Sequence, residues 1–329
     1  MTEPPKKTPA PRTVSFSLLK DLQGKRLDTV LYNIFPEYSR TSLHKSIISG
    51  MVRLENNIPK PATRVKAKQT ITLTLPEQFN PFPQATNEKL FEIIHGEQEF
   101  LIIYKPAGVI VHPGDSREQP TTLISSLIYY YPELAEIGLE TRPAIVHRLD
   151  KDTSGVMIIP RTEKTFEYLK KAFQERNISK KYLALVMGKP PQSGLIESPI
   201  GRNPFSRTRM LANAKRGKEA KTGYKLLRYY PKTNISLLSL TLFTGRTHQA
   251  RVHLSSIHFP ILGDKVYGKK DNTLGKQFPS LCPFLERQLL HAQRLTLTHP
   301  IDGKNLTYLA PLPEDFKDIL KELLKIEKS

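Results

Sequence analysis

The spacing of apolar residues predicts a small helix-and-strand unit near the start of the chain. In residues 26–35 the apolar side chains recur at i, i+3, i+4 and i+7, the pattern of an amphipathic helix, and Pro36 would end it. A second amphipathic helix is predicted over residues 39–50, and short strands over 52–54 and 71–75. This order of elements predicts a compact unit with a core of its own.

Proline-rich residues 77–88 are predicted to form a semi-rigid linker, after which strands and helices alternate. Amphipathic helices are predicted at residues 163–176 and 313–325, and a further helix at 121–130. Strands are predicted at the short apolar or alternating runs, which are residues 91–94, 100–104, 145–146, 156–159, 182–186 and 235–243. The fold class is therefore α+β, with a mixed, largely antiparallel central sheet in residues 89–329.

The densest cluster of polar residues lies between the apolar runs at 145–146 and 156–159. It reads His147-Arg-Leu-Asp150-Lys-Asp152-Thr153. The pattern predicts a strand, a tight loop and a second strand, with the loop presenting an acid and a base on a rigid frame. From the residues alone, a polar hairpin in which Asp152 or Thr153 only hydrogen-bonds the turn backbone is an equally good interpretation.

The charge of the chain indicates a polyanionic partner. The 329 residues carry a formal net charge of +19, and nucleic acid is favoured over an anionic membrane surface as the partner of such a chain. Residues 15–75 contain ten basic and four acidic residues, a net charge of +6. Arg40 and Lys45, near the start of the second predicted helix, are candidates for phosphate contacts because a helix N-terminus adds its own positive dipole.

The composition also predicts where the protein works. Residues 1–12 are rich in Pro and Lys, are predicted to be a disordered tail, and contain no apolar segment of a secretory signal. No apolar run approaches the roughly 18 residues of a membrane-spanning helix. The single cysteine, Cys282, excludes an intrachain disulfide and favours a reducing compartment. We therefore expect a cytoplasmic protein with no membrane partner.

The motifs of metal and nucleotide sites are missing from the sequence. Histidines are numerous, but there is no HExxH motif and no cysteine pair, and their spacing is not that of a zinc site. Neither GxGxxG nor GxxxxGK[ST] occurs. We expect no metal and no nucleotide cofactor.

Five motifs stand out in order along the chain. One is His147-Arg-Leu-Asp150 followed by Thr153-Ser-Gly155. The other four are Lys105-Pro-Ala-Gly-Val-Ile-Val-His112-Pro, Lys181-Tyr182-Leu-Ala-Leu-Val, Gly245-Arg246-Thr-His-Gln-Ala-Arg251-Val-His253, and Leu290-His-Ala with His299-Pro. Together they resemble the motifs of the RluA-type RNA pseudouridine synthases, and the first is similar to the signature of that family. Residues 13–76 resemble the S4 (α-L) RNA-binding module. The resemblance implies a pseudouridine synthase catalytic domain at residues 89–329 and is greatest to the D type, which acts on large-subunit ribosomal RNA.

The resemblance also implies a role for several side chains. Asp150 would be the catalytic carboxylate that assists cleavage of the N-glycosidic bond, while Asp152 would only shape the loop. Arg246 would pair with Asp150, and Arg251 would bind phosphate or serve the structure. Tyr182 would stack on the extruded base.

The remaining expectations concern RNA contacts and the reaction. Arg148 would fill the space that the extruded uracil leaves, and His147 would contact the RNA. The isomerisation is redox-neutral and needs no cofactor, and we expect a monomer. Two alternatives stay open: the same chemistry on other ribosomal or transfer RNA sites, and a non-catalytic RNA-binding ribosome assembly factor. The choice between a covalent and a glycal-type mechanism also stays open.

Overall fold

The computed structural model describes residues 13–35, 38, 40–74, 83–112, 121–139, 142–206, 209–268 and 273–329, and for residues 40–42 the backbone only. The chain divides into two compact units, Met1–Asn80 and Pro81–Ser329. The division falls within the predicted linker at 77–88, of which residues 83–88 are described. The predicted tail at residues 1–12 lies outside the described residues.

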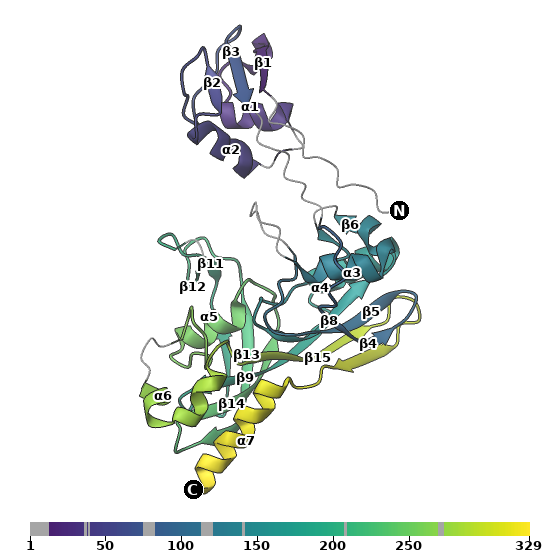
Figure 1. Cartoon of the computed structure of the whole chain (residues 1–329), viewed down its shortest axis with the longest axis vertical. Coiled ribbons are helices and arrows are strands. Elements are labelled where there is room, and N and C mark those ends of the chain that lie inside the picture. The colour runs from purple at the N-terminus through teal and green to yellow at the C-terminus, as the bar shows by residue number, and fades with distance from the viewer. Residues whose placement is uncertain are drawn as a thin grey trace. The chain divides into compact units, whose positions relative to one another are not determined.

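The first unit is a three-stranded antiparallel sheet with two helices (Figure 1). Its elements are β1 (Thr13–Ser17), a 3-10 helix η1 (Lys20–Leu22), α1 (Leu27–Ile34), α2 (Arg40–Ile48), β2 (Val52–Leu54) and β3 (Thr70–Thr74). The strand order is β1-β3-β2. Apolar side chains of both helices and of β2 and β3 are fully buried together, which explains the apolar periodicity of this segment. Strand β1 was not predicted, because its five-residue alternation is short and follows the proline-rich tail.

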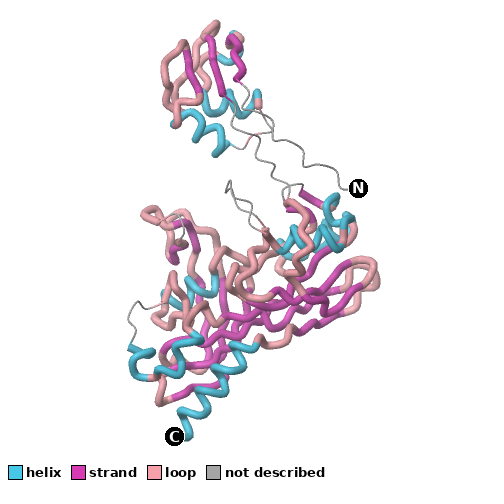
Figure 2. The backbone as a smooth tube through the Cα atoms, viewed as in Figure 1, coloured by secondary structure: helices cyan, strands magenta, loops and turns pink. Residues whose placement is uncertain are grey.

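The second unit is built on a nine-stranded sheet with the order β10-β13-β14-β9-β15-β8-β5-β4, in which β16 also pairs with β15. Figure 2 shows its strands running through the middle of the unit, with helices outside them. The elements are β4 (Glu92–Gly96), β5 (Phe100–Lys105), α3 (Leu123–Tyr130), η2 (Pro132–Glu136), β6 (Gly138–Leu139), β7 (Arg142–Pro143), β8 (Ser154–Pro160), α4 (Glu163–Gln174), β9 (Ser179–Met187), β10 (Ser193–Glu197), β11 (Ile200–Arg202), β12 (Met210–Ala212), β13 (Lys221–Tyr230), β14 (Ile235–Leu242), α5 (Gln249–Ser256), α6 (Thr273–Gln277), η3 (Pro279–Phe284), β15 (Leu290–Thr298), β16 (Asn305–Leu309) and α7 (Glu314–Lys328).

Every ladder of this sheet is antiparallel except that between β15 and β8. The predicted α+β class with a largely antiparallel sheet is therefore confirmed. At the parallel contact Gly155 lies opposite Ala292, and a Cβ on Gly155 would meet the carbonyl oxygen of Ala292 at 2.3 Å. A side chain at position 155 would thus separate the two strands at the point where the polar loop, residues 147–153, ends.

The two faces of the sheet are covered by different helices, and β9 shows which residue faces which side. Tyr182, Ala184 and Val186 join the hydrophobic cluster that contains residues of α3 and α5. Leu183 and Leu185 join the cluster of α7, whose Phe316, Ile319 and Leu323 are fully buried. Tyr182 therefore lies on the α5 side of the sheet, the side on which the polar loop also packs.

Candidate active site

The polar loop leads from β7 into β8. The predicted strand at residues 145–146 is wrong: the structure has no strand there, and Ile145 and Val146 pack as loop residues against the cores. The buried side chain of Leu149 joins the α5-side cluster, and the N–H of Thr153 donates to the carbonyl oxygen of Asp150 over 3.1 Å. Asp150 is thus held between a buried anchor and a turn, with its side chain 18% exposed.

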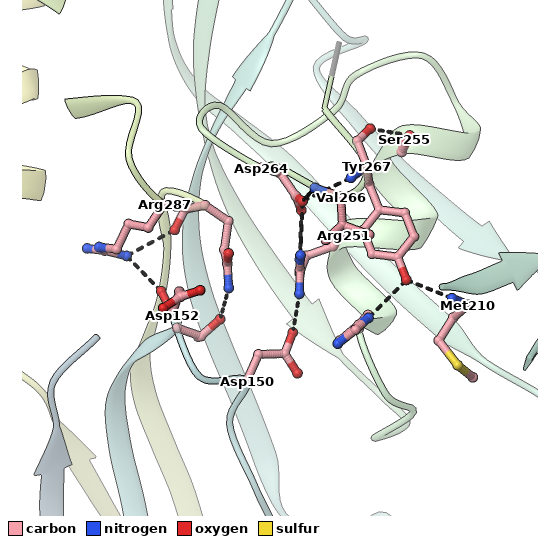
Figure 3. A network of polar contacts seen from close by, with 12 residues as sticks. Asp150, Asp152, Met210, Arg251, Ser255, Asp264, Val266, Tyr267 and Arg287 are labelled. Carbon is pink, nitrogen blue, oxygen red and sulfur yellow. Dashed lines mark hydrogen bonds and ion pairs between the residues drawn. The ribbon is translucent and has the colours of Figure 1, made fainter. Parts of the chain in front are cut away.

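Arg251, in the first turn of α5, is the arginine that pairs with Asp150. Its Nη1 donates to Asp150 Oδ2 at 3.1 Å (Figure 3). The predicted pairing through Arg246 is wrong: Arg246 Nε donates to the carbonyl oxygen of Glu219 at 2.9 Å, and these two described residues, Arg246 and Asp150, form no ion pair. Arg246 precedes the helix, whereas Arg251 is buried within it and reaches Asp150 from there.

A second carboxylate, Asp264, holds the other edge of the Arg251 guanidinium. Nε and Nη2 of Arg251 donate to Asp264 at 2.7 and 2.9 Å, and the side chains are 6% and 0% exposed. The N–H groups of Val266 and Tyr267 also donate to Asp264 Oδ1. Burial alone would raise the pKa of Asp264, but Arg251 and these two N–H groups outweigh it and lower the pKa. Arg251 is therefore fixed by a buried, ionised partner.

Sequence reasoning missed Asp264. The available signal was an aspartate that directly follows an apolar run and a glycine, in Ile261-Leu262-Gly263-Asp264. Such a position is buried at the end of the run, and a buried aspartate needs a cation or several hydrogen-bond donors. Nothing in the sequence indicates that the cation is Arg251, because the pairing depends on how the chain returns from α5.

Tyr267 connects this arginine to the β11–β12 hairpin (Figure 3). Its ring lies 5.1 Å from the Arg251 guanidinium, and its backbone carbonyl accepts from the Ser255 hydroxyl. The Tyr267 hydroxyl accepts from the Met210 N–H at 2.8 Å and lies 2.9 Å from His248 Nδ1. The hydroxyl and His248 Nδ1 are therefore within hydrogen-bond distance, and burial lowers the pKa of His248.

Tyr182 lies on β9, in the same hydrophobic cluster as Leu149, the residue before Asp150. Its ring is buried, and its hydroxyl has no hydrogen bond to any part of the chain that the structure describes. Burial, and then the negative charge of Asp150, raise the pKa of Tyr182. The hydroxyl therefore stays protonated near neutral pH and is available to a ligand as a donor.

The two residues before Leu149 differ in their roles. Arg148 is exposed, and its Nη1 donates to His112 Nε2 at 3.1 Å, beside the loop that carries Asp150. His147 accepts the Ile158 N–H at 3.0 Å through Nε2, and its ring stacks on Phe173 at 4.7 Å. Burial, with a smaller effect of the Lys180 charge, lowers the pKa of His147 to about 3. The expected RNA contact of His147 therefore does not fit: its ring ties the loop to β8 and α4.

The structure describes the side chain of one of the two residues of the first unit that are predicted to contact phosphate. Lys45 is exposed on α2, whereas the side chain of Arg40 lies outside the described residues.

Among the described residues no three potential ligands are grouped as a metal site would require. None of the helices in the described ranges is long and apolar enough to span a membrane.

Comparisons with known proteins agree with this geometry. A family model for RNA pseudouridylate synthase matches residues 99–256. The chain is 39% identical over 300 residues to an uncharacterized RNA pseudouridine synthase of Chloroflexus aurantiacus, covering 91% of this chain and 90% of that protein. It is 35% identical over 315 residues to the ribosomal large subunit pseudouridine synthase D of Haemophilus influenzae, covering 94% and 95%. Among solved structures, human RNA pseudouridylate synthase domain containing 4 has a TM-score of 0.55 and 27% identity, covering 70% of this chain and 92% of that one.

Proposed function

Because the chain belongs to the RNA pseudouridylate synthase family, we propose that it converts specific uridines of large-subunit ribosomal RNA to pseudouridine, with Asp150 as the catalytic carboxylate. The observation that carries the assignment of Asp150 is its ion pair with the buried Arg251, on the face of the sheet from which Tyr182 also points.

The reaction needs what this arrangement can supply. The bond between N1 of uracil and the anomeric carbon breaks, the base rotates, and C5 bonds to the same carbon, while a proton leaves C5 and N1 gains one. Cleavage develops positive character on the sugar, which a neighbouring carboxylate stabilises or captures. Asp150 is partly exposed and can approach the sugar. Arg251 stabilises the charged carboxylate and fixes its direction.

Tyr182 would bind the extruded base. An aromatic ring that stacks on a base contributes roughly 1–3 kcal/mol by alanine substitution. The ring of Tyr182 belongs to the α5-side cluster, so it cannot turn away from the site. Its protonated hydroxyl would donate to an oxygen of the base or ribose rather than remove the C5 proton as a phenolate.

The β11–β12 hairpin offers a surface for the RNA that flanks the target. Residues 198–218 contain six Lys or Arg and no Asp or Glu. Phe205 is 96% exposed at this hairpin, where it could stack on an unpaired base. The hairpin is attached to the site, since Met210 donates to the Tyr267 hydroxyl and the Arg209 guanidinium donates to the carbonyl oxygen of Val266. Bound RNA would therefore lie beside the Arg251–Asp150 pair.

The first unit would bind RNA as an S4-like domain at residues 13–76. Its net charge of +6 over residues 15–75 and the exposed Lys45 on α2 support phosphate contacts. The protein would act in the cytoplasm as a monomer, without a nucleotide cofactor. Relatives named as acting on the ribosomal large subunit favour that RNA over transfer RNA.

The test is a map of pseudouridine in ribosomal and transfer RNA from a deletion strain complemented with wild type, Asp150→Asn or Asp152→Asn. Asp152→Asn is the matched control, because it makes the same chemical change in the same loop without touching the Arg251 pair. We expect large-subunit sites to be lost in the deletion strain and restored by wild type and Asp152→Asn only.

Two results would contradict the proposal in different ways. Full modification of large-subunit RNA in the deletion strain, with losses only in transfer RNA, would contradict the proposed substrate but not the proposed enzymatic activity. Restoration by Asp150→Asn would remove the assignment of the catalytic carboxylate.

A further inference from the structure

The three residues that follow Asp150 are all held by side chains from elsewhere in the catalytic unit. Lys105 Nζ donates to the carbonyl oxygen of Lys151 at 2.9 Å, and Gln288 Nε2 donates to Thr153 Oγ1 at 3.3 Å. Between them, Arg287 Nη1 donates to the carbonyl oxygen of Asp152 at 3.1 Å (Figure 3). The loop contains no regular secondary structure at these positions, so these bonds define its path.

Arg287 is itself oriented by the C-terminal helix. Its Nε and Nη2 donate to the two carboxylate oxygens of Asp315 at 2.6 and 2.8 Å. This bidentate contact fixes the plane of the guanidinium and leaves Nη1 for the Asp152 and Gln288 carbonyl oxygens. Asp315 lies in the first turn of α7, where the helix dipole favours a negative charge.

Helix α7 is a rigid support for this contact. Its Phe316, Ile319 and Leu323 are fully buried in one cluster with residues of β9 and η3. The Arg287 side chain is 10% exposed, whereas that of Asp315 is 40% exposed at the edge of the helix. An ion pair with one partner this exposed adds little to the free energy of unfolding. A mutation of Asp315 can therefore disturb the loop without unfolding the protein.

We propose that Arg287 and Asp315 are positioning residues, through which the C-terminal helix holds the loop backbone so that the Asp150 carboxylate meets the Arg251 guanidinium. The inference rests on the proposed catalytic role of Asp150. The chain is anchored before Asp150 by the buried Leu149, and after it by three side-chain contacts, of which the one from Arg287 is tied to the C-terminal helix. Without the Arg287 contact, the loop can shift by a fraction of an ångström while the core stays intact. Displacement of a reacting group by about 1 Å can reduce the rate of the chemical step about 100-fold.

The experiment compares Asp315→Ala with Asp318→Ala in the full-length protein. Asp318 is the matched control, because it lies on the same helix and, among the described residues, pairs with the exposed Lys321 alone, at 2.8 Å. We expect Asp315→Ala to lower kcat on RNA about tenfold or more, with KM within about twofold and Tm within about 3 °C of the control. Asp315→Glu, which keeps the carboxylate, should restore part of kcat.

Amide hydrogen exchange gives a readout that does not depend on catalysis. The Thr153 N–H, which donates to the Asp150 carbonyl oxygen, should exchange faster in Asp315→Ala and remain protected in Asp318→Ala. Equal kcat and equal exchange in the two variants would overturn the proposal. Faster exchange over the whole catalytic unit would also overturn it, because the effect would then be global unfolding. If Asp150→Asn proved active, the proposed function would fail, while the exchange experiment would still report on the contact from α7.

Discussion

The buried Arg251–Asp264 pair allows a prediction in which one mutation changes stability in opposite directions in two backgrounds. The two side chains are 6% and 0% exposed, and the pair carries two hydrogen bonds at 2.7 and 2.9 Å. Arg251→Gln leaves the Asp264 charge buried without its cation. Removal of one partner of such a pair costs about 3–5 kcal/mol of unfolding free energy. In the wild-type background, Asp264→Asn is also destabilising, because Arg251 then keeps Asp150 as its one counter-charge among the described residues.

In the Arg251→Gln background the sign of the second mutation reverses. Asp264→Asn then removes the unpaired buried charge, and its amide oxygen still accepts from the Val266 and Tyr267 N–H groups. We expect the double variant to be about 1–3 kcal/mol more stable than Arg251→Gln alone, the cost of leaving a buried polar group without its partner. Turnover should be absent in Arg251→Gln and also in the double variant, since Asp150 lacks the Arg251 guanidinium in both.

The assay is urea unfolding at 20 °C, combined with pseudouridine formation on RNA. The chain contains no tryptophan, so unfolding is followed by circular dichroism. Fits should allow separate transitions for the two compact units, and only the catalytic unit should respond. Equal destabilisation by Asp264→Asn in both backgrounds would show that the pair is not coupled. Turnover regained together with stability in the double variant would show that Asp150 does not need Arg251.

Further predictions concern the other site residues, the pH response and the first unit. Arg246→Ala should leave kcat near the wild-type value, because Arg246 contacts a backbone oxygen and not Asp150; a loss of kcat as large as that of Arg251→Gln would contradict the assignment. The pKa of His147 is about 3 in the folded protein and near 6.5 in the unfolded chain. Between pH 6.5 and pH 4.5 only the unfolded chain takes up this proton, so lowering the pH over that range should reduce the free energy of unfolding by about 2 kcal/mol. His147→Gln should remove that part of the pH dependence, and an unchanged slope in urea titrations would count against it. Deletion of residues 1–76 should weaken RNA binding and reduce its salt dependence while kcat at saturating RNA persists, and identical binding at every salt concentration would argue against an S4-like role.

Much of the fold was readable because helices and strands impose their periods over neighbouring residues. The helices predicted at 163–176 and 313–325 are α4 and α7, and the run at 182–186 lies within β9. The short run at 145–146 failed as a strand, because two apolar residues fit a loop anchored in the core as well as they fit a ladder. The five-residue strand β1 was missed because its own apolar pattern is short and its pairing partner, β3, lies more than fifty residues away.

The sequence by itself determined the class of the fold, the basic character of the chain, and the loop that carries Asp150 beside an apolar strand. Only the tertiary structure decided that Arg251 rather than Arg246 reaches Asp150, that Asp264 holds Arg251, and that the His147 ring is used inside the protein. Asp150 and Arg251 are separated by 101 positions, and their contact depends on the order of strands between them and on where α5 begins. Periodicity is a property of neighbours along the chain. An ion pair between buried groups depends instead on atoms that the whole fold brings within about 3 Å, the range of a charge-assisted hydrogen bond.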